Sequence, residues 1–91
     1  MTLIEAIAEM SDRAIEELGA PLILIVAGTD LWVSISRYDA ERQTKVLLDA
    51  IGEPDDHLPL LLIFVGPADR VQVHRIDVGT AQGEVKPQRV N

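Results

Sequence analysis

The amino-acid sequence predicts an α+β fold, a two-layer sandwich in which two helices cover a four-stranded, mostly antiparallel sheet. Two short apolar runs are unbroken and bounded by turn residues, which is typical of strands buried on both faces. Two other stretches alternate like half-buried strands, and two more repeat apolar residues at helical spacing. The expected order α-β-β-α-β-β comprises a helix over 3–18, strands over 22–27 and 31–38, a helix over 40–51, and strands over 58–65 and 70–78.

The first helix is predicted from its ends. Thr2 can accept a hydrogen bond from the Glu5 amide while the Glu5 carboxylate reaches back, which is the pattern of a capping box. Gly19 is suited to end the helix. One face carries an acidic stripe, which we interpret as solvated or, alternatively, as a docking face for a basic partner. The stripe consists of Glu5, Glu9, Asp12 and Glu16.

The hairpin that follows provides the predicted interaction patch. Residues 28–30 form the turn, and alternation in the second strand is expected to place Leu31, Val33 and Ile35 on the core face. The other face then carries two large rings of the kind that dominate interface energetics. The predicted patch consists of Trp32, Ser34, Ser36, Arg37 and Tyr38. The alternative is that Trp32 belongs to the core.

The second half of the chain is read in the same way. Asp39 is the expected N-cap of the second helix, and residues 66–69 have the composition of a turn. The alternation of the last strand slips by one position, which predicts a β-bulge near residues 74–75. The single domain is expected to end at residue 78. Residues 79–91 are expected to form a flexible tail, or alternatively a strap held on a partner through Val85 and Val90.

The packing problem gives the main functional expectation. The two continuous apolar runs should be the inner strands, which predicts the spatial order 2-1-3-4. Two inner apolar strands present apolar side chains to both sides of the sheet, but two helices on one side leave the other side uncovered. Large exposed apolar patches are unusual on monomers. A second protein is therefore expected on that side, and a two-fold homodimer is the commonest arrangement.

The charge is unevenly distributed along the 91 residues. Residues 1–60 contain twelve Asp and Glu against four Lys and Arg, a net charge of −8, whereas residues 61–91 carry +1. Binding to a phosphate backbone requires clustered Lys and Arg, so no direct nucleic-acid partner is expected. The chain has no cysteine. It also has no run of about 20 apolar residues. We therefore expect a cytoplasmic protein with no membrane association.

No arrangement of residues predicts catalysis, a metal or a cofactor. His57 follows Asp55 and Asp56, but three consecutive side chains do not converge on one ion. The glycines at 79–83 lack the spacing and the lysine of a phosphate loop. A hydrolytic set lacks a nucleophile elbow, and its serines are better explained as the polar side of a strand. That set would combine Ser34, Ser36, Tyr38, Asp39 and His74.

The sequence therefore predicts a non-catalytic protein–protein interaction module that associates with itself through a sheet face or edge. One alternative is a small acidic inhibitor, such as a phage or mobile-element antagonist, that occupies a basic surface of a larger target. Another is a small enzyme or ligand-binding subunit whose site forms between protomers and uses His57, His74 or Tyr38.

Overall fold

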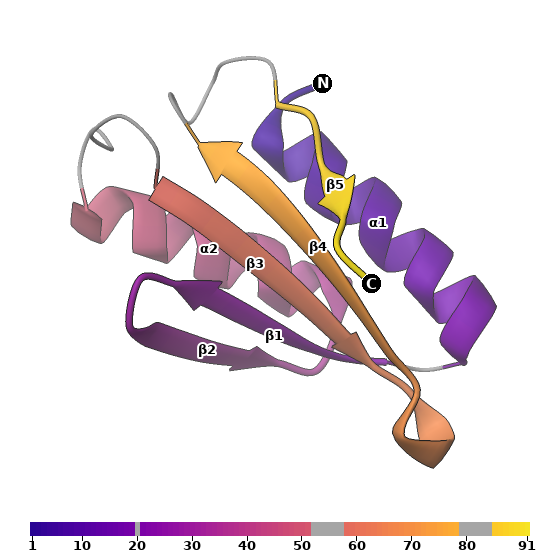
Figure 1. Ribbon diagram of the computed structural model, residues 1–91. Coiled ribbons are helices and arrows are strands. Elements are labelled where there is room, and N and C mark those ends of the chain that lie inside the picture. The colour runs from indigo at the N-terminus through magenta and orange to yellow at the C-terminus, as the bar shows by residue number, and fades with distance from the viewer. Residues whose placement is uncertain (20, 52–57, 79–84) are drawn as a thin grey trace.

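The computed structural model describes residues 1–19, 21–51, 58–78 and 85–91, and it confirms the α+β sandwich. Two helices lie against one sheet, which contains a fifth strand beyond the four expected (Figure 1). The elements are α1 (Leu3–Leu18), β1 (Leu22–Ala27), β2 (Asp30–Ser34), α2 (Arg37–Ile51), β3 (Leu58–Val65), a short 3-10 turn (Pro67–Asp69), β4 (Val71–Val78) and β5 (Gln88–Arg89).

The sheet is antiparallel throughout and has the order β2-β1-β3-β4-β5. The first four strands follow the predicted order, with the two continuous apolar runs at the centre. The β-bulge predicted near residues 74–75 is wrong. β3 and β4 pair without interruption from Leu58 opposite Val78 to Val65 opposite Val71. The slip in alternation arises because β4 presents Val71 and Val73 to one side of the sheet and Ile76 to the other.

α1 has the predicted ends. The Thr2 hydroxyl accepts a hydrogen bond from the Glu5 amide at 3.2 Å, and Gly19 ends the helix with a φ of 94°. Its apolar stripe is buried against the sheet together with alternate residues of β1, β3 and β4. The core contains Leu3, Ala6, Ile7, Met10, Ala14, Leu18, Ile23, Ile25, Ala27, Ala40, Leu47, Leu60, Leu62, Phe64, Ile76 and Val85.

α2 begins three residues earlier than expected, because Ser36 and not Asp39 caps it. The Asp39 amide donates to the Ser36 hydroxyl at 3.2 Å, and this hydroxyl donates to the Asp39 carboxylate at 3.0 Å. The pair satisfies one helix-end donor and holds the first turn. β2 therefore ends at Ser34, so Tyr38 lies on a helix and not on a strand.

The described part of the C-terminal segment differs from the expected flexible tail. Val85 is buried, and its amide donates to the Met1 carbonyl at 3.0 Å. Gln88 and Arg89 pair with β4, and the Val90 amide donates to the Val73 carbonyl at 2.8 Å. Residues 85–91 therefore extend the sheet beside β4 (Figure 1). Residues 79–84 lie outside the described part of the chain.

Candidate interaction surface

The candidate interaction surface is the side of the sheet opposite the helices. In Figure 1 both helices lie behind the sheet, and no described helix crosses the side that faces the viewer. Side chains alternate between the faces of a strand, so the helix-facing positions leave a second set pointing away. We call the apolar members of this second set the open sheet face. They are Leu22, Leu24, Val26, Leu31, Val33, Leu61, Ile63, Val65, Val71 and Val73.

Exposure differs between the middle and the edges of the open sheet face. The side chains on β1 and β3 are half-buried, because neighbouring strands flank them on both sides. At the edge strand β2, Leu31 and Val33 are exposed, and Val71 is exposed on β4. None of these apolar side chains belongs to the buried core. The face is therefore a continuous apolar surface that crosses four strands.

Charge is nearly absent from this surface. Among the outward-pointing positions of the five described strands, the charged residues are Arg75 and Asp77, both on β4. Their side chains pair with each other, with 3.1 Å between Arg75 Nη2 and Asp77 Oδ1. The pair lies at one end of β4, and the centre of the open sheet face carries no charge. Such a surface favours contact with another apolar surface over contact with a charged one.

The predicted orientation of β2 is wrong. Trp32 lies opposite Ile25 and packs against the core, while Ser34 lies opposite Ile23 and is buried. Neither the Trp32 Nε1–H nor the Ser34 hydroxyl has a hydrogen-bond partner among the described residues. Leu31 and Val33, expected in the core, lie on the open sheet face. The alternative that placed Trp32 in the core fits this position.

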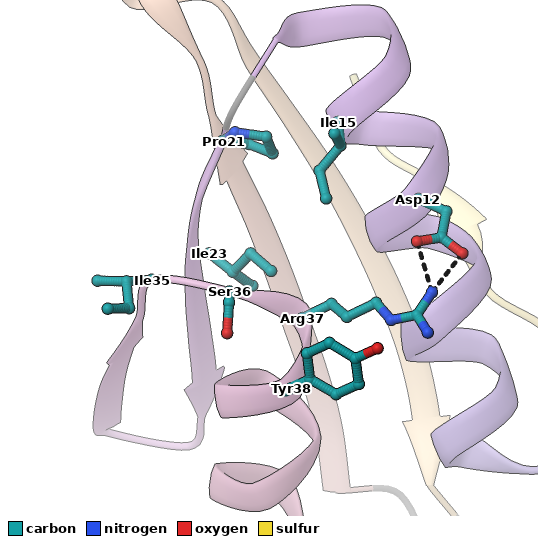
Figure 2. Close-up of a pocket in the computed structure, with 8 residues that line it drawn as sticks. All are labelled: Asp12, Ile15, Pro21, Ile23, Ile35, Ser36, Arg37 and Tyr38. Carbon is teal, nitrogen blue, oxygen red and sulfur yellow. Dashed lines mark hydrogen bonds and ion pairs between the residues drawn. The ribbon is translucent and has the colours of Figure 1, made fainter.

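The other three residues of the predicted patch gather elsewhere, around a hollow between α1 and the start of α2. The hollow has a volume of about 430 Å³. Figure 2 shows Arg37 extended toward Asp12, with Tyr38 beside it. The hollow is lined by Asp12, Ile15, Pro21, Ile23, Ile35, Ser36, Arg37 and Tyr38. The structure thus separates the predicted patch into a buried pair, Trp32 and Ser34, and a trio at the hollow.

An ion pair joins the two helices at this hollow. Arg37 Nη1 donates to both carboxylate oxygens of Asp12, at 2.6 and 2.7 Å. The guanidinium carbon also lies 5.0 Å from the centre of the Tyr38 ring, within the range of a cation–π contact. The hydrogen bond from Arg37 and the negative charge of Asp12 raise the pKa of Arg37 above its ordinary value. The Arg37 guanidinium is therefore already paired with the Asp12 carboxylate.

The acidic stripe on α1 is only partly neutralised. Asp12 pairs with Arg37, and Glu9 pairs with Arg13 at 2.8 Å. Glu5 and Glu16 have no ion-pair partner within the described ranges. All four side chains lie on the side of α1 away from the core, and Asp12 also lines the hollow. Their position keeps a negative surface on the helix layer, on the opposite side of the molecule from the open sheet face.

The described residues that were considered for catalysis or metal binding do not come together at one site. His74 lies on the helix-facing side of β4, with its ring at 78° to that of Phe64 and 5.5 Å between ring centres. Burial and the positive charge of Arg89 lower the pKa of His74. Ser36 and Asp39 are engaged in the helix cap. Over the described ranges, no group of three or more His, Asp or Glu side chains could hold a metal. Residues 55–57 and 79–84 lie outside those ranges.

In comparisons with family models, curated proteins and solved structures, nothing matches this chain. The fold and the surface define its class, an α+β sandwich with one side of its sheet uncovered by the described helices. In the part of the chain that the structure describes, every helix is too short or too polar to cross a bilayer.

Proposed function

We propose that this chain is a non-catalytic interaction module that forms a two-fold homodimer by packing the open sheet face of one copy against that of another. The observation that supports this function is the continuous apolar surface across β2, β1, β3 and β4, opposite the helix layer. Water contact with such a surface costs free energy, roughly 25 cal/mol for each Å² of apolar area. Association removes this cost.

The open sheet face supplies about half of the area of a standard interface in projection. Neighbouring strands lie about 4.8 Å apart and residues rise about 3.3 Å along a strand, and the four strands of the face contain 5, 6, 8 and 8 residues. Their projection is about 430 Å², compared with about 800 Å² per partner in a standard interface. The relief of the side chains adds further area. Sheet-on-sheet packing is an established way to bury two twisted apolar faces.

The charge distribution favours a second copy as the partner. A protein with a net charge of −7 repels its own copies unless its charges stay apart. In a face-to-face dimer, two sheets about 10 Å apart lie between helix layers each about 10 Å thick, so the acidic stripes on the outer sides are about 30 Å apart. That separation exceeds the Debye length of about 8 Å at physiological salt. Among the described residues of the sheet, the charged side chains in this interface would be Arg75 and Asp77, which pair with each other.

A matched pair of valine substitutions tests this function. Val33 on the open sheet face and Val46 on α2 have similar exposure, 57 % and 49 %. Val33→Lys places a charge in the proposed interface, whereas Val46→Lys adds the same charge to the helix layer. We expect light scattering after size exclusion to give twice 10.0 kDa for the unchanged chain and for Val46→Lys, and 10.0 kDa for Val33→Lys.

Circular dichroism of both variants separates loss of association from loss of the fold. A mass of 10.0 kDa for the unchanged chain at millimolar concentration would contradict the proposal. Equal dimerisation of the two variants would place the interface on another surface.

A further inference from the structure

A second surface, independent of the open sheet face, combines an apolar hollow with negative charge. The hollow lies between α1 and the β2–α2 connection, on the helix layer (Figure 2). Its volume of about 430 Å³ falls in the range of roughly 300–1,000 Å³ found for ligand pockets. Its walls come from three separate parts of the chain that α1 and β1 hold in place. It is therefore a formed feature of the fold.

Large apolar side chains stand exposed at the rim of this hollow. Ile35 is 81 % exposed, and the Tyr38 ring is 70 % exposed. Ile15 on α1 completes the rim from the other side and is also exposed. Below the rim, Pro21 and Ile23 form a buried apolar floor. An aliphatic side chain that entered the hollow would lie above this floor and cover the rim.

The charge beside the hollow is negative, because Glu16 lies on the same side of α1 as the Asp12–Arg37 ion pair, whose own charges cancel. Asp12 lines the hollow, and Glu16 follows one turn later on the same side of α1, with no ion-pair partner among the described residues. Among the described lining residues the one cation is Arg37, which donates to Asp12 and lies over Tyr38. An incoming carboxylate would have to displace Asp12 from Arg37. A Lys or Arg beside Glu16 would gain attraction from that unpaired carboxylate without breaking the Asp12–Arg37 pair.

We propose that this hollow binds a short segment of a partner protein that carries an aliphatic side chain beside lysine or arginine. The aliphatic side chain occupies the space above Pro21 and Ile23, and the flanking basic side chains lie along the acidic stripe at Asp12 and Glu16. The apolar contact supplies most of the affinity, and the charge selects a basic segment over an acidic one. In a face-to-face dimer the two hollows lie on the outer sides, so both functions can operate together.

The test is a titration of the full chain with three blocked pentapeptides at low salt, in which heteronuclear NMR monitors the amide chemical shifts of the chain. The probes are Lys-Lys-Ile-Lys-Lys, Lys-Lys-Ser-Lys-Lys and Glu-Glu-Ile-Glu-Glu. We expect saturable shifts at Ile35, Ser36 and Tyr38 with the first peptide. Affinity should fall about tenfold when serine replaces isoleucine, because an isoleucine side chain buried in the hollow is worth that much or more. The acidic peptide should not saturate.

Variants assign the two components of binding. Ile35→Ser should lower the affinity for the basic peptide by removing an apolar contact at the rim, and Glu16→Lys should lower it by removing a negative charge. Val46→Ser, on the exposed side of α2, should leave this affinity unchanged. Val33→Lys should also bind normally, which separates this surface from dimerisation. Equal binding of the isoleucine and serine peptides, shifts elsewhere on the molecule, or no saturable shift with any peptide would each overturn the proposal.

Discussion

Individual residues decide where the elements of this fold begin and end. A hydroxyl three residues before a carboxylate starts each helix, Thr2 before Glu5 in α1 and Ser36 before Asp39 in α2. The sequence predicted the first cap correctly. It missed the second because Asp39 is itself a good cap, and only the geometry shows that Ser36 accepts the amide hydrogen bond.

His74 provides a prediction about stability and pH. Its imidazole lies between β4 and α1, where burial and then Arg89 lower its pKa below the ordinary 6.5, against an opposing contribution from Glu17. The unfolded chain therefore binds the proton more readily than the folded chain. The contribution of neutral His74 to stability is complete above pH 6.5 and is lost as the pH falls through the lower, folded pKa.

We expect His74→Gln to reduce the fall in the free energy of unfolding between pH 7.5 and 5, measured by urea titration at fixed protein concentration. Above pH 7 the curves of the variant and the unchanged chain should run parallel. If the variant loses stability with falling pH as steeply as the unchanged chain does, another group controls this pH range.

At the scale of elements, register explains why the orientation of β2 could not be read from its own residues. The strand has apolar residues at both sets of alternating positions, with Leu31 and Val33 on one face and Trp32 on the other. Pairing with β1 decides between them, since Trp32 falls opposite the buried Ile25 and Val33 opposite Leu24. The short β5 was also missed, because two residues have no periodicity to detect.

The contact between the end of α1 and the β3–β4 turn gives a second prediction. Gly66 has a φ of −104°, which any residue adopts, but a Cβ there would lie 2.7 Å from the Leu18 carbonyl oxygen and 2.8 Å from the Leu18 Cβ. Gly66→Ala should therefore force α1 and the turn apart and destabilise the fold by roughly 1–3 kcal/mol. Thermal or urea unfolding measures the loss.

Gly28 is the matched control, because its constraint is of the opposite kind. It has a φ of 62°, and a Cβ would meet nothing within 4 Å. Asparagine tolerates this conformation, so Gly28→Asn should lower the free energy of unfolding less than Gly28→Ala does. At Gly66, asparagine should lower the free energy of unfolding at least as much as alanine does. The same ranking at both positions would show that the contact at Leu18 does not limit the fold.

At the scale of the whole molecule, composition predicted the architecture better than it predicted the surface. The two continuous apolar runs, 22–27 and 58–65, became inner strands, where the neighbouring strands shield apolar side chains on both faces. The same two runs predicted that a second protein covers the side of the sheet that the helices leave bare. Which residues lie on the uncovered side depended on helix placement and register, and neither is encoded in a single segment.

The central claim is that two copies pack through the open sheet face, and intermolecular nuclear Overhauser effects test it most directly. Isotope-labelled and unlabelled chains are mixed, and only contacts between copies are recorded. We predict cross-peaks between methyl groups of Leu24, Val33 and Ile63 in one copy and those of its partner. A dimer whose intermolecular contacts lie on the helices, or a chain without such contacts at millimolar concentration, would contradict the account.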